Sequence, residues 1–264
     1  MTLQFCSFAS GSSGNCYVVK DEKTAILIDA GISGKRIVGG LNDTDTPADQ
    51  VAAVLVTHEH SDHVKSLGVI AKRIPGLLVY ANEATWACID EPVPEERRRT
   101  FVTGEDFYIG DFMIRPFAIS HDAAEPVGFS IYRGDKQVSI LTDSGCINEE
   151  QFEEVLDADL LVLEANHEEE MLLFGRYPYT LKHRILGDEG HLSNITAGQW
   201  LCRIVNKRPK NRRVLLGHMS RENNTPEVAM QAVRNTLEEN GIYIGGSLKV
   251  DVVLRDAVSK LYTV

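Results

Sequence analysis

Long apolar runs, a cysteine framework and an excess of positive charge are all missing from this sequence of 264 residues. No stretch of roughly 18 apolar residues occurs, so no transmembrane helix is expected. Residues 1–15 have neither a basic start nor a long apolar stretch, so we expect no secretory signal. The 5 cysteines are odd in number and lack Cys-x-x-Cys spacing. This pattern argues against disulfides or a cysteine-based zinc site and favours the reducing cytoplasm.

Positive charge is scarce because 27 lysines and arginines are opposed by 38 aspartates and glutamates, for a net charge of −11. Such a chain does not bind nucleic acid through its overall charge. A phosphate-bearing substrate would have to be held by metal ions or by a local basic patch. Apolar residues make up 43% of the chain, and no linker rich in proline, glycine or serine divides it. The sequence therefore predicts one layered α/β domain over residues 1–264.

Short apolar runs recur along the chain and predict strands. Several of them alternate between apolar and polar residues, which favours one buried face per strand. Arg133-Gly134-Asp135 is typical of a turn, so Val127–Leu141 is expected to form a hairpin. The predicted strands are Ala25–Ile28, Ala53–Val56, Leu77–Tyr80, Phe112–Phe117, Val127–Tyr132, Val138–Leu141, Leu160–Leu163, Val214–Leu216 and Val250–Leu254.

Helices are expected between these strands. Val64–Arg73 and Asn194–Asn206 carry apolar residues at helical spacing. Pro226–Asn240 is bounded by Thr225, a suitable N-cap, and by Gly241, a suitable stop. Strand-rich halves with helices outside them predict layers in the order helix, sheet, sheet, helix.

The strongest chemical signal is a cluster of histidines directly after an apolar strand. His58, His60 and His63 account for three of the 8 histidines in the chain, and Asp62 lies among them. This concentration argues against a polar loop that holds histidines by chance. Ser61 is expected to cap the next helix, which places Asp62 and His63 on its first turn. Imidazole and carboxylate ligands suit zinc, manganese or iron, so one ion is expected at His58 and His60 and a second at Asp62 and His63.

These four residues do not complete two metal sites, so further ligands must come from elsewhere in the chain. His121, Asp143 and His218 each follow an apolar run. Active sites of open α/β sheets gather at such strand ends. Any one of the three alone is more simply a solvated loop residue, but together with the cluster they predict additional ligands.

The chain resembles the metallo-β-lactamase superfamily in five places. They are Asp29 in Leu-Ile-Asp-Ala-Gly, the His-x-His-x-Asp-His motif at residues 58–63, His121, Asp143 and His218. They follow one another in the order found in that family. The resemblance implies an αββα sandwich with the site at one edge of its two sheets.

The resemblance also implies a role for each of these residues. Asp143 would bridge two divalent metal ions, and Asp29 would hold the cluster without binding metal. The two implied ligand sets are His58, His60 and His121 for the first ion, and Asp62, His63 and His218 for the second. Two metal ions roughly 3.5–4 Å apart lower the pKa of a bridging water and bind a phosphoryl oxygen. Asp62 and Asp143 would help to hold the resulting hydroxide for its attack on phosphorus.

Downstream motifs resemble the nuclease and phosphodiesterase branch of that superfamily. They are Leu163-Glu164-Ala165-Asn166-His167, Gly190-His191-Leu192-Ser193-Asn194 and Gly217-His218-Met219-Ser220-Arg221. The branch that contains tRNA 3′-processing nuclease pairs such a glutamate and histidine. The resemblance implies that His191 protonates the leaving oxygen while Glu164 orients it. The alternative interpretation of His191 is a capping or structural histidine beside Ser193.

The opening Cys6-Ser7-Phe8-Ala9-Ser10-Gly11-Ser12-Ser13-Gly14-Asn15 resembles a group of exonuclease-like bacterial proteins in this family. The resemblance implies 5′-to-3′ degradation of DNA strands, with single-stranded DNA ends as substrate. One alternative is a phosphodiesterase acting on a small cyclic or nucleotide substrate. Another is a metal-binding regulatory protein without catalysis. A thioester or lactam hydrolase is disfavoured, because the pair of Glu164 and His191 points to a phosphate leaving group.

Substrate contacts are expected from loops and from a cationic strip. The Ser10–Asn15 loop is either a phosphate cradle, with Asn15 as a contact, or a tight turn. Ser220 and Arg221 adjoin His218, so Arg221 is either a phosphate ligand or a surface arginine. The segment at 176–184 interleaves cations with tyrosines, as surfaces that bind single strands do. Its predicted contacts are Arg176, Tyr179, Lys182 and Arg184.

Two other cationic stretches read more simply as ordinary surface. The segment at 207–213 lies between a predicted helix and a predicted strand and is interpreted as a solvated face. The segment at 97–99 follows two glutamates and is interpreted as part of a mixed-charge helix face.

Overall fold

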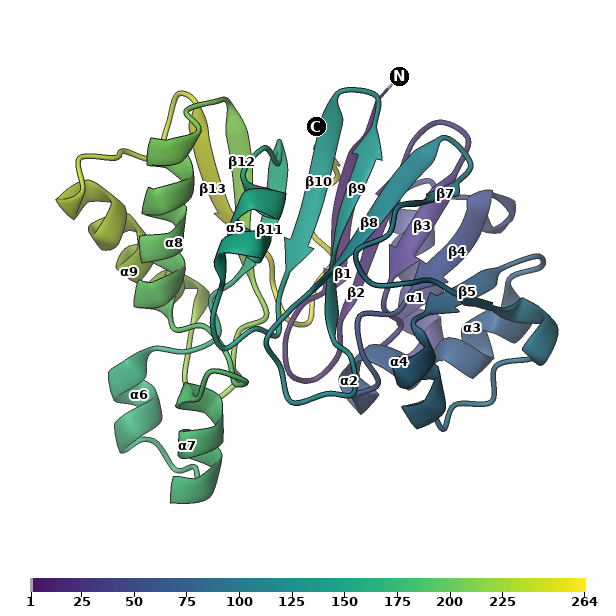
Figure 1. Ribbon diagram of the computed structural model, residues 1–264, viewed down its shortest axis with the longest axis horizontal. Helices are drawn as coiled ribbons and strands as arrows, with labels where there is room; N and C mark the ends of the chain where they lie inside the picture. The colour runs from purple at the N-terminus through teal and green to yellow at the C-terminus, as the bar shows by residue number, and fades with distance from the viewer. Residues whose placement is uncertain (1) are drawn as a thin grey trace.

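The computed structural model describes residues 2–264 and consists of two seven-stranded sheets packed face to face between layers of helices (Figure 1). The first sheet has the strand order β14 (Tyr262–Thr263), β1 (Gln4–Ala9), β2 (Cys16–Lys20), β3 (Ala25–Ile28), β4 (Val51–Leu55), β5 (Leu78–Ala81) and β6 (Arg98–Thr100). The second has the order β13 (Leu248–Val252), β12 (Arg212–Gly217), β11 (Leu160–Glu164), β10 (Lys136–Leu141), β9 (Val127–Arg133), β8 (Phe112–Ala118) and β7 (Phe107–Ile109).

Helices cover the outer face of each sheet. The first sheet is covered by α1 (Gly34–Asp43), α2 (Ser61–Val64), α3 (Leu67–Arg73) and α4 (Glu83–Cys88). The second is covered by α5 (Glu149–Val155), α8 (Asn194–Lys207) and α9 (Pro226–Glu239). Two further helices, α6 (Glu169–Phe174) and α7 (Tyr179–Leu186), project from the edge of the sandwich. Among residues 2–264, no helix is long and apolar enough to cross a membrane. The predicted αββα sandwich is confirmed.

The core has three apolar layers, because side chains alternate along each strand. In β11, Leu160 and Val162 face the layer between the sheets, whereas Leu161 and Leu163 face α5, α8 and α9. The expectation of one buried face per strand is wrong for the central strands. All residues of β2, β3 and β11 are buried, as in sheets that are covered on both sides.

The predicted hairpin is confirmed, with β9 and β10 joined at Gly134, whose φ of 63° suits the turn. The helix predicted at Val64–Arg73 is two helices, α2 and α3. The prediction that Ser61 caps α2 is wrong, because the N-cap is His60 and no side chain caps the helix. The helix predicted across 97–99 is also wrong, because only Glu95–Arg97 is helical, as a 3-10 turn, and edge strand β6 follows it.

Parallel pairing brings the ends of several strands to one edge. Strands β3 and β4 are parallel, as are β10, β11 and β12, so the loops after them meet at the edge where α2 begins (Figure 1). Three residues just past these strands have left-handed backbones: Asp29 with φ 61°, Asp143 with φ 58° and His218 with φ 52°. Non-glycine residues rarely adopt such values, and strain of this kind clusters at functional sites.

The backbone of Gly31, just after β3, packs directly against the backbone of Asp62 in the His-x-His-x-Asp-His motif. A Cβ atom added at Gly31 would lie 1.5 Å from the carbonyl oxygen of Asp62. We expect Gly31→Ala to lower the free energy of unfolding by roughly 1–3 kcal/mol, because the backbone at Asp62 must move. Urea unfolding of the metal-free protein measures this.

Gly39→Ala is the matched control. Gly39 lies within α1, and a Cβ there would have nothing within 4 Å. Alanine in a helix is favoured over glycine by about 0.5–1 kcal/mol, so this variant should be slightly more stable. Equal effects of the two substitutions would contradict the close approach.

Candidate active site

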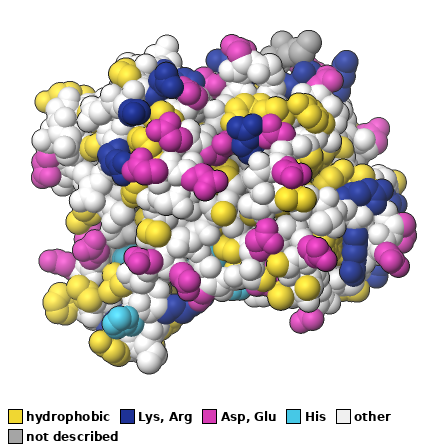
Figure 2. Space-filling view, viewed as in Figure 1, with side chains coloured by type: hydrophobic (Ala, Val, Ile, Leu, Met, Phe, Trp, Pro, Cys, Tyr) yellow, Lys and Arg dark blue, Asp and Glu magenta, His cyan; other side chains and the backbone are white. Residues whose placement is uncertain are grey.

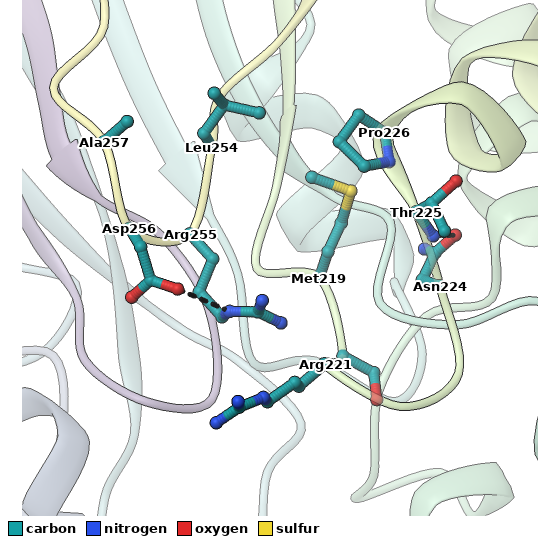
Figure 3. Close-up of a pocket in the computed structure, with 10 residues that line it drawn as sticks. Met219, Arg221, Asn224, Thr225, Pro226, Leu254, Arg255, Asp256 and Ala257 are labelled. Atoms are coloured by element: carbon teal, nitrogen blue, oxygen red, sulfur yellow. Dashed lines mark hydrogen bonds and ion pairs between the residues drawn. The ribbon is translucent and has the colours of Figure 1, made fainter.

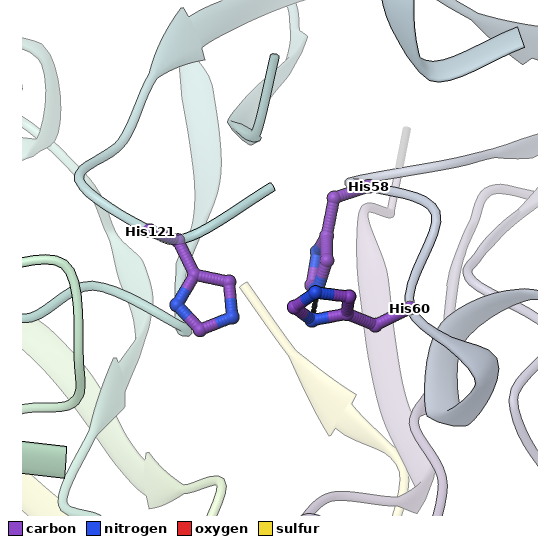
Figure 4. A group of neighbouring side chains, drawn as sticks. All are labelled: His58, His60 and His121. Atoms are coloured by element: carbon purple, nitrogen blue, oxygen red, sulfur yellow. Dashed lines mark hydrogen bonds between the residues drawn. The ribbon is translucent and has the colours of Figure 1, made fainter. Parts of the chain in front are cut away.

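Three imidazoles from two loops converge on the first candidate metal position (Figure 4). His58 and His60 follow β4, with Nε2 of His58 3.1 Å from Nδ1 of His60. His121 follows β8, and its Nδ1 faces the carbonyl of Gly190 at 3.3 Å. With Nδ1–H donated to that carbonyl, Nε2 of His121, which lies 3.5 Å from Oδ1 of Asp122, keeps the lone pair that a metal ion needs. The predicted grouping of His58, His60 and His121 is thus brought together in space.

The second candidate position lies beside the first and combines a carboxylate with two imidazoles. Asp62 and His63 come from α2, and His218 comes from the loop after β12. Nε2 of His63 lies 3.5 Å from Oδ2 of Asp62. The predicted second set is therefore also assembled.

Asp143 lies between the two groups, as expected of a bridging ligand. Its Oδ2 is 3.7 Å from Nε2 of His63, and its Oδ1 is 3.2 Å from Nε2 of His218. Asp143 Oδ2 and His218 Nε2 are buried, and within residues 2–264 neither has a hydrogen-bond partner. Orphaned buried atoms of this kind are rare in proteins, and a cation would satisfy both. The donor set of histidine nitrogens and carboxylates fits divalent transition metals.

Asp29 supports the metal-ligand cluster through hydrogen bonds and belongs to neither ligand set. Its Oδ2 accepts a 2.7 Å hydrogen bond from Nδ1 of His63, which directs Nε2 of that ring toward the metal position. Thr57 donates to Asp29 through its amide and hydroxyl, and its hydroxyl also lies 3.0 Å from Nδ1 of His58. Thr57 was not identified in the sequence, although it directly precedes His58. Such partners fix the orientation of metal-binding imidazoles.

Glu164 connects the metal cluster to His191. This carboxylate ends β11 and is fully buried. Its Oε1 lies 2.8 Å from Nδ1 of His191 and 2.9 Å from Nδ1 of His218, and its Oε2 accepts from the amide of Ser144. One carboxylate therefore orients both a metal ligand and the predicted acid. Nε2 of His191 has no hydrogen bond to any of the described residues.

The electrostatics of the metal-free site depend on this alternation of imidazoles and carboxylates. Burial alone would raise the pKa of Glu164, but the charges and hydrogen bonds of His191 and His218 hold it below its ordinary value. Burial alone would lower the pKa of His218, but Asp143 and Glu164 raise it to about 9. Burial and the neighbouring histidines lower the pKa of His58. The first position thus presents a neutral ring, and the second is rich in negative charge.

The predicted loop contacts are placed differently. Asn15 is buried, accepts the amide of Gly11 and lies 3.0 Å from Nε2 of His63, so it supports the cluster and does not face a substrate. The amides of Gly14 and Asn15 are also bonded internally, to Gly11 and Asp62, which favours the tight-turn interpretation. Ser220 is buried and receives two hydrogen bonds from Asn223, but it lines a small pocket beside His191.

Arg221 borders an open hollow of about 440 Å³ beside the start of α9. Arg255 borders the same hollow from the segment after β13 and pairs with Asp256 at 3.1 Å (Figure 3). The guanidinium of Arg221 forms no ion pair with any residue in the described part of the chain. It therefore stays available for an anionic ligand.

The predicted cationic strip is divided between structural and exposed residues. Lys182 donates to the carbonyls of Leu173 and Gly175, so it joins α6 to α7 and is not free for phosphate. Arg184 forms a two-pronged ion pair with Asp122. Arg176 is exposed, and Tyr179 is 76% exposed. The strip as predicted therefore retains Arg176 and Tyr179 as accessible contacts.

The helices α6 and α7 form a protruding lobe, residues 169–186, that carries exposed apolar side chains (Figures 1 and 2). Phe174 is 86% exposed and Leu173 is 52% exposed. Phe174 was not singled out in the sequence, where nothing distinguishes it from a core residue.

The stretch at 207–213 is largely occupied by internal contacts. Arg212 is buried and donates to the carbonyls of Leu156 and Arg208. Arg213 pairs with Asp251, and Lys210 pairs with Asp159. The interpretation of this stretch as a plain solvated face is thus wrong for Arg212, whose guanidinium closes the end of α8.

A model of the β-lactamase superfamily domain matches residues 24–219. The chain belongs to the metallo-β-lactamase superfamily. Exodeoxyribonuclease YycJ of Bacillus anthracis is 36% identical over 253 residues, which cover 95% of each protein. Exodeoxyribonuclease WalJ of Streptococcus pneumoniae is 37% identical over 253 residues, 94% of this chain and 93% of the relative.

Among solved structures, the metallo-β-lactamase fold protein YhfI of Bacillus subtilis aligns with a TM-score of 0.72 over 100% of both chains. The sequence identity between the two chains is 16%, so the alignment is evidence of a shared fold alone. The resemblance to this superfamily inferred from the sequence motifs is confirmed, as is the resemblance to its exonuclease-like group.

The buried His167, close in sequence to Glu164, predicts how the free energy of unfolding depends on pH. His167 is 1% exposed, and within residues 2–264 neither ring nitrogen has a partner. Burial lowers its pKa to about 4. An unfolded histidine titrates near ~6.5 and binds the proton first, so stability is present above that pH and is lost as the pH falls toward 4.

We therefore expect His167→Gln to flatten the acid limb of the stability curve by about 1.4 kcal/mol per pH unit between pH ~6.5 and ~4. Urea unfolding at several pH values, with chelator present throughout, measures the slope. Parallel curves for wild type and variant would contradict a neutral buried His167.

Proposed function

We propose that this chain is a metal-dependent phosphodiesterase that removes nucleotides from the 5′ end of single-stranded DNA. The relatives named exodeoxyribonuclease cover nearly the whole chain at 36% and 37% identity. Two divalent metal ions, either zinc, manganese or iron, are proposed at the two ligand groups. All five cysteines are free, which supports the proposed location in the reducing cytoplasm.

The observation that carries the proposal is the double contact of Glu164. It holds His218, a proposed metal ligand, and His191, the proposed acid, within hydrogen-bond distance of one oxygen. A metal-binding protein without catalysis has no need for a histidine that is oriented beside the cluster yet is not part of either ligand set. The arrangement favours a reaction in which a leaving oxygen takes up a proton.

The chain's own residues divide the work in this proposal. Bound metal ions would supply an activated water and stabilise charge on the phosphoryl group. Asp62 and Asp143 carry negative charge within the ligand groups, where they would hold the ions and offset part of their positive charge. Glu164 fixes the His191 ring through Nδ1, which leaves Nε2 to deliver a proton to the leaving oxygen.

The lobe supplies the surface for the strand in this proposal. The chain is acidic overall, so long-range attraction does not gather DNA. Exposed Phe174 and Tyr179 offer faces on which bases stack, and exposed Arg176 lies between them in sequence. Arg221 offers a further cation at the neighbouring hollow.

Substrates with different leaving groups test whether His191 acts as the acid. We expect His191→Ala to slow nucleotide release from 5′-phosphorylated single-stranded DNA by roughly 10²–10⁴-fold. With bis(p-nitrophenyl) phosphate, whose leaving group needs little protonation, the loss should be about tenfold or less. His60→Ala should abolish both reactions. Rates are measured with manganese or zinc supplied, and Lys72→Ala, an exposed lysine on α3 that belongs to neither the site nor the lobe, is the control expected to behave as wild type.

Each other outcome has a distinct meaning. Equal losses of His191→Ala on both substrates would remove its role as acid. Activity that survives His60→Ala would place the reaction outside this cluster. Wild-type activity confined to small phosphodiesters would favour a small cyclic or nucleotide substrate. Full hydrolysis in His191→Ala would likewise remove its role as acid, and no hydrolysis by the wild type would favour the regulatory alternative.

Stacking on the lobe gives a separate prediction for affinity. We expect Phe174→Ala and Tyr179→Ala each to weaken binding of single-stranded DNA by roughly 5- to 150-fold, since one base–aromatic stack contributes about 1–3 kcal/mol. Fluorescence anisotropy of a labelled oligonucleotide, at fixed salt and with calcium in place of the active metal, measures this. Leu173→Ala, also exposed on α6 but without a ring, is the control. Unchanged affinity in both aromatic variants would exclude the lobe as the binding surface.

A further inference from the structure

A small pocket opens beside His191. It measures about 140 Å³ and is lined by Ser12, Asn166, Tyr177, Leu181, Arg184, Ile185, His191 and Ser220. The wall contributed by the lobe carries one aromatic ring, two aliphatic side chains and the guanidinium of Arg184. The residues outside the lobe form a polar wall with two hydroxyls, one amide and the His191 ring. Such a combination suits a flat ring with polar edges.

The polar wall has an acceptor in place for a ligand. Asn166 is 3% exposed, and its Nδ2 donates to the carbonyl of His218 at 2.9 Å. Among the hydrogen bonds of residues 2–264, none involves Oδ1 of this side chain. The amide is therefore held in one orientation, with its acceptor unused. Ser220 accepts two hydrogen bonds and keeps its own proton to donate.

The size of the pocket limits what enters it. A cavity of roughly 150 Å³ accepts one benzene ring. The pocket of about 140 Å³ is therefore comparable in size to one six-membered ring.

The position of His191, the proposed acid, indicates which base of the strand enters the pocket. In 5′-end cleavage, the water oxygen bonds to phosphorus and the bond from phosphorus to O3′ of the terminal nucleotide breaks. The proton of His191 goes to that O3′, and the rest of the strand keeps the phosphate as its new 5′ end. The leaving nucleotide thus lies on the same side as His191, which is the side of the pocket.

Building on the proposed function, we infer that this pocket binds the base of the 5′-terminal nucleotide, between Tyr177 and Leu181 on one wall and Asn166 on the other. The inference makes degradation proceed one nucleotide at a time. It also makes the rate depend on the terminal base, although the reacting bond is in the backbone.

An abasic end tests this inference. Two 5′-phosphorylated single strands are compared, identical except that one carries a tetrahydrofuran abasic residue at its 5′ terminus. We expect wild type to release the normal terminal nucleotide roughly tenfold faster, within the range of base–aromatic stacking. In Leu181→Trp, where the indole fills the pocket, the ratio of the two rates should fall to near one.

Two further variants keep the test independent of folding. Leu186→Trp adds the same ring to the same helix at an exposed position that does not line the pocket, and it should keep the wild-type ratio. Tyr177→Phe keeps the stacking face and should keep most of the ratio, whereas Tyr177→Ala should lose it. Circular dichroism and thermal unfolding show whether each variant is folded.

The outcomes separate this inference from the proposed function. Equal wild-type rates on the two strands would overturn the pocket inference and leave the exonuclease proposal standing. The same would follow from a ratio that survives both Leu181→Trp and Tyr177→Ala. Release of no nucleotide from either strand would overturn the proposed function and this inference with it. Products of two or more nucleotides as the first species released would also overturn the inference.

Discussion

The buried carboxylate of Glu164 is the contact on which the rest of the site depends. It ends a strand that is buried on both faces, and it meets two imidazoles and the amide of Ser144. A carboxylate without partners at this depth would be strongly disfavoured, so Glu164 and its partners must form together. The fold thereby ties the orientation of His218 to that of His191. Metal binding and proton delivery then share one scaffold.

The edge of the sandwich gathers such groups by bending the chain sharply where strands end. Asp29, Asp143 and His218 each turn through a left-handed backbone immediately past a strand. Each such turn is unfavourable for a non-glycine residue by about 1–2 kcal/mol. The deep burial of β3, β10 and β12 compensates, because those strands have little freedom to shift. The stability of the two sheets thus holds these residues in strained backbone conformations and fixes the positions of their side chains.

Much of this arrangement could be predicted from sequence because the signals were local. A dense histidine motif after an apolar run predicts its own geometry, and His121, Asp143 and His218 follow runs of the same kind. Strands β1 and β2 were missed, because Cys6, Ser7 and Cys16 weaken the apolar pattern although they are buried. Asn15 and Lys182 were assigned to substrate because residue type does not reveal which neighbour a polar group meets.

The acidic surface and the proposed DNA substrate are compatible if recognition is short-ranged. With a net charge of −11, the chain as a whole does not attract a long polyanion. Stacking and a fitted pocket act only within contact distance. A strand end offers both an unpaired base and a free path into a small pocket, whereas the interior of a duplex offers neither. The charge therefore selects against long polyanions, and the contacts beside His191 select for an end.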